Sequence, residues 1–137
     1  MNLKTIALAA GCFDGDLHPG HLNLLKTMRE MSDFTVVLIN CDEYVRDKKG
    51  PNRPIYKAQQ RVSNLYVSGY VDMVIVFENN VRLLSHIQSI RPAFIFVGED
   101  YTKETTVGWP ECEAWGGEVI FAPKTHSTSE IYKAKES

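Results

Sequence analysis

The sequence predicts an α/β protein: a single Rossmann-like domain with a five-stranded parallel sheet and helices on both faces. Short apolar runs alternate along the chain with segments whose apolar residues recur at helical spacing. The run FTVVLI at 34–39 is β-branched or apolar at every position, as expected for a strand that is covered on both faces. Strands that alternate with helices through right-handed crossovers give a parallel sheet between two helical layers.

Five strands and five helices are expected. The predicted strands are Ile6–Ala10, Phe34–Ile39, Met73–Phe77, Phe94–Val97 and Val119–Ala122. The predicted helices are Gly20 to about Met31 with Pro19 in the first turn, Tyr56 to about Ser68, a helix capped by Asn79 or Asn80, Pro110–Trp115, and one opened by the capping box at 127–130. The polar, basic segment Asp42–Pro54 is predicted to be a mobile loop, and 99–110 is predicted to be irregular.

Length and composition narrow the class of protein. The 137 residues favour one domain, residues 1–137, which is long enough to bury a continuous core. The net charge of -2 gives no sign of a nucleic-acid or membrane partner. The apolar stretch that ends at Gly11 is too short for a membrane span and lacks a signal-peptide cleavage pattern. Three cysteines without a CxxC pair fit a reducing cytoplasm better than a disulfide framework or a zinc site.

The candidate site is expected where strands end. Ligands of open parallel sheets bind beyond the carboxyl ends of the strands, where the strand order reverses. The segment HPGH at 18–21 starts a helix there, and helix N-terminal N–H groups attract phosphate. His18 and His21 are three residues apart, so both rings can face one side of the turn, while Gly20 lets a ligand approach the backbone.

Cations and a second helix start add to this site. Arg46, Lys48 and Lys49 follow the second strand, with Arg61 on the next helix, and Lys124 precedes the hydroxyl-rich segment 127–129. Two helix N-termini, two histidines and several cations together describe a polyphosphate site. The absence of a GxxxxGK[ST] loop and of a GxGxxG fingerprint argues against a P-loop NTPase and a standard dinucleotide dehydrogenase.

These motifs resemble those of the cytidylyltransferase-like nucleotidyltransferases. GCFD at 11–14 with HPGH at 18–21 is similar to the family's opening motif, and STSEI at 127–131 is similar to its second signature. Matches lie between them in order at 40–42, 49–50, 53–54, 60–61, 71–72, 98–101 and 116–119. The pattern is most similar to the adenylyltransferase domain of ADP-heptose synthases, with glycerol-3-phosphate cytidylyltransferase second. The chain departs from the family by one additional residue before His18 and by a short spacing between Lys124 and Ser127.

The resemblance implies in-line attack by an acceptor phosphate on the α-phosphorus of a nucleoside triphosphate, with release of pyrophosphate. The acceptor phosphate is largely ionised at neutral pH because its second pKa is about 6, so no general base is needed. Catalytic roles are implied for His18, His21, Lys49 and Arg61. The implied nucleotide-binding residues are Gly11, Cys12, Phe13, Gly20, Gly98, Asp100, Lys124, Ser127, Thr128 and Ser129. Asp14 and Asp42 are implied to bind the acceptor, Mg²⁺ is expected to be held mainly by phosphates, and a homodimer is expected.

Several alternatives stay open at the level of the sequence. ATP with a sugar 1-phosphate competes with CTP and a polyol phosphate, and local matches at 53–54, 60–61 and 116–119 favour ATP. A nucleotide-binding module without turnover is a second class, but both histidines, Lys49 and Arg61 are retained, which argues against it. A flavodoxin-like redox protein would have the same topology, but no flavin feature is evident.

Overall fold

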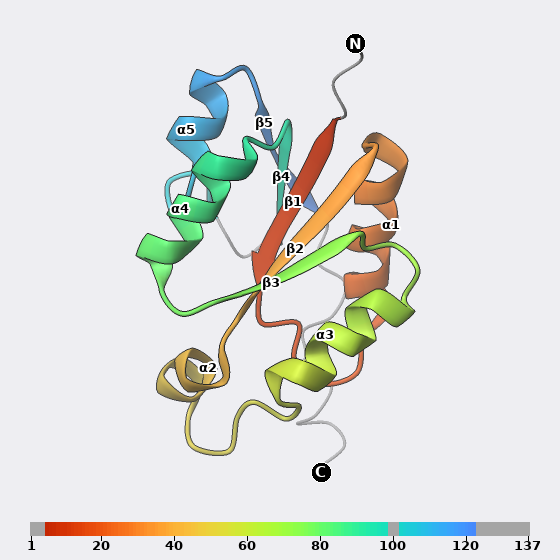
Figure 1. Cartoon of the computed structure of the whole chain (residues 1–137), viewed down its shortest axis with the longest axis vertical. Helices are drawn as coiled ribbons and strands as arrows, with labels where there is room; N and C mark the ends of the chain where they lie inside the picture. Colours follow the sequence, from red (N-terminus) through yellow and green to blue (C-terminus); the bar gives the residue numbers. More distant parts are fainter. Residues whose placement is uncertain (1–4, 99–101, 123–137) are drawn as a thin grey trace.

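The sheet contains five parallel strands in the order β3-β2-β1-β4-β5 (Figure 1). The structure is a computed structural model and describes residues 5–98 and 102–122. The strands are β1 (Ile6–Gly11), β2 (Phe34–Asn40), β3 (Met73–Phe77), β4 (Phe94–Gly98) and β5 (Glu118–Ala122). All neighbouring pairs are parallel. The predicted fold class is therefore confirmed, and each predicted strand end agrees with the structure to within one residue.

Helices cover both faces of the sheet. The helices are α1 (Pro19–Met31), α2 (Asp42–Lys49), α3 (Ala58–Val67), α4 (Asn80–Ile90) and α5 (Trp109–Ala114). Helices α1 and α3 lie on one face, α4 and α5 lie on the other, and α2 lies beyond the carboxyl ends of the strands (Figure 1). The predicted helix that starts at Ser127 lies outside the described residues.

The expectation of a mobile loop from Asp42 to Pro54 is wrong over the length of α2. Asp42 and Glu43 occupy the first turn of this helix, and basic side chains occupy its last turn, as the helix dipole favours. Gly50 ends the helix with φ 107°, and its N–H binds the carbonyl of Arg46. Val45 is the one fully buried side chain of α2, so the sequence lacks the apolar periodicity that would have revealed the helix.

The core consists of two layers, one on each side of the sheet. Residues that alternate along a strand point to opposite faces, so a sheet covered on both sides needs apolar residues at consecutive positions. On the α1 and α3 side the core includes Ala7, Ala9, Val37, Ile39, Leu25, Met28 and Leu65. On the α4 and α5 side it includes Leu8, Val36, Leu38, Ile95, Leu83, Ile87 and Cys112. This explains the uninterrupted apolar run of β2.

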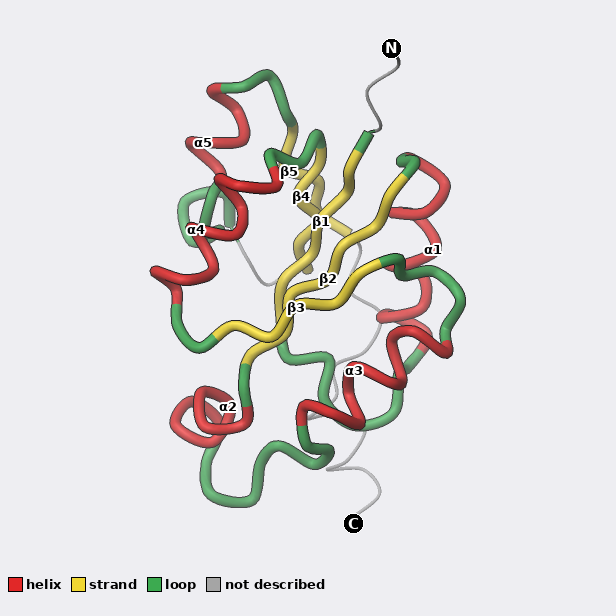
Figure 2. The backbone as a smooth tube through the Cα atoms, viewed as in Figure 1, coloured by secondary structure: helices red, strands yellow, loops and turns green. Residues whose placement is uncertain are grey.

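The order of the strands reverses at β1. The chain builds β1, β2 and β3 toward one edge, and then α4 crosses to the other face so that β4 pairs with β1. The segments that leave the carboxyl ends of β1 and β2 lie at the lower edge of the sheet (Figure 2). The ligand site is therefore expected between the ends of β1 and β4. Within the described residues, no helix is long and apolar enough to cross a membrane.

Candidate active site

Helix α1 begins with two stacked histidines. His18 is the N-cap, with an extended backbone (φ -96°, ψ 172°), and its Nδ1 accepts a hydrogen bond of 3.3 Å from the His21 N–H. The two rings are 3.6 Å apart between centroids, with an angle of 18° between their planes. A ring nitrogen that accepts a hydrogen bond carries no proton, so this cap assigns His18 the neutral form with its N–H on Nε2. That N–H is a suitable donor to a phosphate oxygen.

His21 is held in its neutral form. Burial lowers the pKa of His21 to about 3, and the electrostatic influence of His18 and Lys49 acts in the same direction. The Phe13 ring lies on the other side of the imidazole, with centroids 5.1 Å apart. Both histidines are thus suited to donate hydrogen bonds to an anion rather than to exchange protons with it.

Asp14 is saturated by hydrogen bonds from the protein. Its carboxylate is 1% exposed and accepts from the N–H groups of Gly15 (2.8 Å), Ile55 (2.7 Å) and Tyr56 (2.9 Å) and from Arg53 Nε (2.9 Å). Burial alone would raise the pKa of Asp14, but these hydrogen bonds together outweigh it, and the pKa is lowered. In this arrangement Asp14 ties the β1–α1 loop to the segment before α3, and its predicted contact with the acceptor stays a prediction.

Arg61 is fully buried and joins three segments of the chain. Its guanidinium donates to the Tyr56 carbonyl (3.0 Å), to the Cys12 carbonyl (3.0 Å) and to Asp42 Oδ1 (2.7 Å), and its exposed fraction is 0%. Asp42 Oδ1 also accepts the Ala58 N–H at 2.7 Å. These contacts fix the backbone of Cys12, directly after β1. They favour a positioning role over the predicted contact of Arg61 with phosphates.

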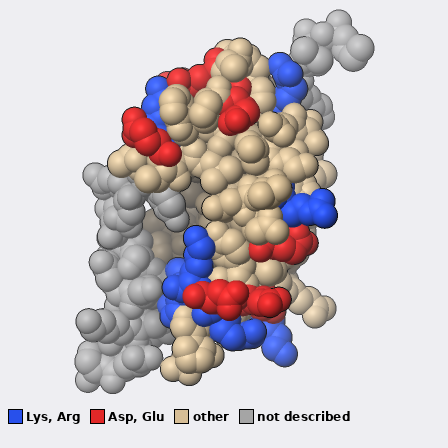
Figure 3. Space-filling view, turned by 90° about the vertical axis from the view of Figure 1, so that its left-hand side faces the viewer, with Lys and Arg blue, Asp and Glu red and all other residues tan. Residues whose placement is uncertain are grey.

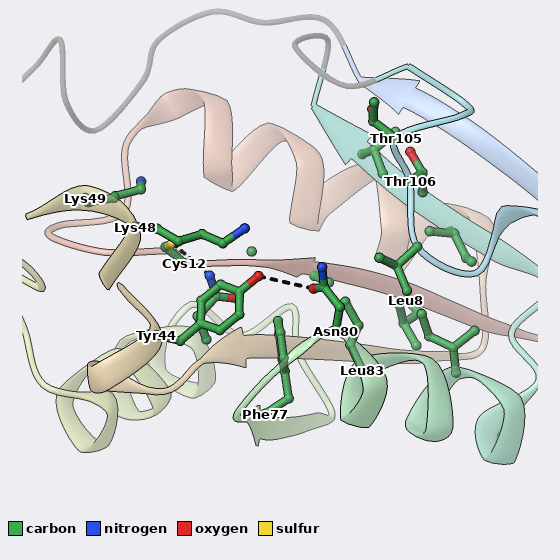
Figure 4. A pocket seen from close by; sticks show the side chains of 17 residues that line it. Leu8, Cys12, Tyr44, Lys48, Lys49, Phe77, Asn80, Leu83, Thr105 and Thr106 are labelled. Atoms are coloured by element: carbon green, nitrogen blue, oxygen red, sulfur yellow. Dashed lines mark hydrogen bonds between the residues drawn. The ribbon is translucent and has the colours of Figure 1, made fainter. Parts of the chain in front are cut away.

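A pocket of about 290 Å³ lies on the α4 side of the end of β1 (Figure 4). Gly11, Cys12 and Lys49 line it, so it adjoins the histidine site. Asn40 also lines it and donates a hydrogen bond to Cys12 Sγ at 3.2 Å. On the same side of the molecule, the surface is hollowed next to a cluster of Lys and Arg side chains (Figure 3).

The structure brings together most of the predicted site residues that it describes. Those around the end of β1 and the start of α1 are Gly11, Cys12, Phe13, His18, Gly20, His21 and Lys49. Gly98 ends β4, the strand beside β1. Asp100, Lys124, Ser127, Thr128 and Ser129 lie outside the described residues, and their nucleotide contacts stay predictions.

The carboxylates of the site are engaged in hydrogen bonds within the protein. The oxygens of Asp14 and Asp42, which are predicted to bind the acceptor, accept hydrogen bonds from protein donors. Across residues 5–98 and 102–122, no group of three or more His, Cys, Asp or Glu side chains could hold a metal. That phosphate oxygens and water supply most ligands of Mg²⁺, which commonly binds in this way, stays a prediction.

Sequence reasoning missed part of the pocket wall. Tyr44 on α2 and Asn80 on α4 form a hydrogen bond of 3.1 Å, and Thr105 and Thr106 line the pocket from the β4–α5 segment. The acidic start and basic end of α2, followed by Gly50, were the signals that could have placed Tyr44 on a helix. No local signal pairs Asn80 or the threonines with Tyr44, because these residues are distant in sequence.

Comparisons with known proteins show the family of the chain. A family model described as cytidylyltransferase-like matches residues 8–134. The bifunctional protein HldE of Acidiphilium cryptum is 41% identical over 126 residues, which cover 90% of this chain and 26% of the relative. The HldE protein of Hyphomonas neptunium is 39% identical over 134 residues, which cover 96% of this chain and 27% of the relative. The chain thus spans about a quarter of the length of these relatives.

A solved structure supports the fold. The lipopolysaccharide core biosynthesis protein from Thermoplasma volcanium matches with a TM-score of 0.69 at 22% identity, over 90% of this chain and 98% of that one. Fold, site and relatives together define the protein as a nucleotidyltransferase. The chain belongs to the cytidylyltransferase-like family.

Proposed function

We propose that the protein transfers the adenylyl group of ATP to a sugar 1-phosphate, with heptose 1-phosphate as the first candidate, and releases pyrophosphate. The pair of neutral, stacked histidines at the N-terminus of α1, close to the Lys49 charge, carries this proposal. The identity of about 40% with HldE proteins and the motif resemblance to ADP-heptose synthases support the choice of ATP and a sugar phosphate.

The site fits a transfer that needs no protein base. An oxygen of the acceptor phosphate bonds to the α-phosphorus, the bond from that phosphorus to the bridging oxygen breaks, and pyrophosphate leaves with the electron pair. His18 Nε2–H and the N–H groups of α1 donate to the phosphoryl oxygens as their charge grows, and Lys49 adds a positive charge. Bound Mg²⁺ would neutralise charge on the phosphates. Removing one such donor costs on the order of a hundredfold or more in rate.

The test is pyrophosphate release by the protein with Mg²⁺ and either ATP or CTP, against a panel of sugar 1-phosphates and polyol phosphates. We expect release only with ATP and a sugar 1-phosphate. His18→Ala and His21→Ala should abolish it, whereas His86→Ala on α4, away from the motifs, should not. Pyrophosphate release that persists in both His18→Ala and His21→Ala would contradict the proposed mechanism.

A second candidate is a cytidylyltransferase that acts on a polyol phosphate, which the resemblance to glycerol-3-phosphate cytidylyltransferase favours. The same panel separates the two candidates, because release would then require CTP. Nucleotide binding without release on any acceptor would favour a binding module without turnover. Homodimerisation is proposed on the resemblance alone, and sedimentation equilibrium tests it.

A further inference from the structure

We propose that Tyr56 is a positioning residue for the histidine pair, and that it acts by holding Asp16 in the β1–α1 loop. The Tyr56 hydroxyl donates a hydrogen bond of 2.8 Å to Asp16 Oδ1. Asp16 lies two residues before His18, the N-cap of α1. This inference rests on the proposed function for its rate measurement and on the structure alone for its NMR measurement.

The β1–α1 loop needs contacts outside itself to keep its shape. Phe13 has a φ of 47° and Gly15 a φ of 75°, so two of its residues are in the left-handed region. For a bulky residue such as Phe13 this conformation is unfavourable and persists only where the surroundings hold it. Asp14, between these two residues, accepts hydrogen bonds from the Ile55 N–H (2.7 Å) and the Tyr56 N–H (2.9 Å). These bonds hold the first half of the loop.

The Tyr56–Asp16 hydrogen bond holds the second half of the loop. Asp16 is exposed, and its bond to the half-buried Tyr56 favours one orientation of the carboxylate. That orientation restricts the path of the backbone from Asp16 to His18. A misplacement of about 1 Å at a group that acts on the reacting atoms can cost about a hundredfold in rate. A contact two residues away from His18 is therefore able to affect catalysis.

Tyr56 suits this role because its own backbone is fixed. Its N–H donates to Asp14, and its carbonyl accepts from Arg61 Nε at 3.0 Å. Arg61 is fully buried and also binds the Cys12 carbonyl, at the beginning of the same loop. The loop passes beside the segment that leads into α3 (Figure 1). A tyrosine side chain has only two rotatable torsions, so a fixed backbone places its hydroxyl accurately.

The rate test uses variants that remove or keep this hydrogen bond. Tyr56→Phe and Asp16→Ala remove it and should each lower kcat of pyrophosphate release about three- to tenfold, the scale of one hydrogen bond. KM for ATP should change less, because the displaced histidine acts mainly as charge grows in the transition state. Asp16→Asn keeps an oxygen that can accept from the hydroxyl and should retain most of the activity. The double variant Tyr56→Phe, Asp16→Ala should be no slower than the slower single variant.

Tyr66→Phe is the matched control for Tyr56→Phe. It removes the same atom from another tyrosine, whose hydroxyl accepts the Val74 N–H at 2.9 Å, away from the histidine motif. This variant should leave kcat unchanged. Unchanged kcat in Tyr56→Phe would overturn the inference. An Asp16→Asn variant as slow as Asp16→Ala would also overturn it, because Asp16 would then act through its charge and not through the bond to Tyr56.

A measurement on the free protein separates this inference from the proposed function. The Hε1 NMR signals of His18 and His21 report the stacking of their rings, whose centroids are 3.6 Å apart. We expect both signals to shift in Tyr56→Phe and to stay in place in Tyr66→Phe. Shifted signals, with no pyrophosphate release by the wild type, would support the inference and contradict the proposed function. Release by the wild type, with both signals unchanged in Tyr56→Phe, would support the function and refute the inference.

Discussion

His21 shows how burial sets the chemistry of a single side chain. Its imidazole packs between His18 and Phe13, and the Lys49 charge acts on it as well. Burial of the ring, with the electrostatic influence of His18 and Lys49, disfavours its positive form and lowers the pKa of His21 to about 3. The residue is therefore a neutral hydrogen-bonding group throughout the physiological pH range.

The shifted pKa of His21 predicts acid sensitivity of the fold. The unfolded chain binds a proton at this ring below about 6.5, whereas the folded protein does not until about 3. The free energy of unfolding therefore falls as pH decreases through this window, by up to about 1.4 kcal/mol for each pH unit from this group. Urea unfolding at pH 7, 6 and 5 should show the wild type losing stability relative to His21→Gln. A ring NMR titration of His21 centred near pH 6.5 would contradict the assignment.

At the scale of elements, buried polar side chains hold the active-site loop. Asp14 fixes the loop to the segment before α3, and Arg61 fixes it to α2 and α3. Two charges at 1% and 0% exposure are tolerated because each has several partners. The position of the Cys12 carbonyl thus depends on the contacts that Arg61 makes between this loop, α2 and α3.

Arg61→Met separates a positioning role from a phosphate contact. Loss of the guanidinium leaves the Asp42 carboxylate and two carbonyls without their donor, so we expect a loss of about 3 to 5 kcal/mol in the free energy of unfolding. Urea denaturation in the absence of nucleotide measures this directly. Arg82→Met on the exposed side of α4 is the control and should change stability little. Unchanged stability with a large drop in kcat would instead support direct phosphate binding by Arg61.

At the scale of the whole molecule, nucleotide binding should stabilise the fold. The predicted triphosphate site draws on segments after β1, β2 and β4, so a bound nucleotide favours the folded state of the entire sheet. At a ligand concentration of about 100 times Kd, binding adds about 2.7 kcal/mol to the free energy of unfolding.

Thermal unfolding with MgATP, MgCTP and each nucleotide in EDTA measures this stabilisation. We expect MgATP to raise Tm by several degrees, which is the scale for a domain of this size. The rise should shrink without Mg²⁺ and in His18→Ala. An unchanged Tm with every nucleotide would argue against a triphosphate site, and a larger rise with CTP would shift the base preference.

Apart from α2, the sequence by itself determined the order of the described elements, the parallel sheet and the place of the histidine motif. These features follow from local signals: apolar runs, helical spacing, and a capping segment directly after a strand. The relative position of His18 and His21 could be predicted because residues three apart lie on the same side of a helical turn.

Only the tertiary structure decided what the other polar residues contact. Arg61 and Asp14 were expected to contact substrates, but both form buried hydrogen-bond networks within the protein. The distant partners of Arg61 are 19 and 49 residues away in sequence. Those of Asp14 are 39 to 42 residues away. Helix α2 is anchored by Val45, and the pocket wall pairs Tyr44 with Asn80, 36 residues apart. Such contacts depend on how the chain packs, because a buried charge is stable only where folding brings its partners to it, and no local pattern records those partners.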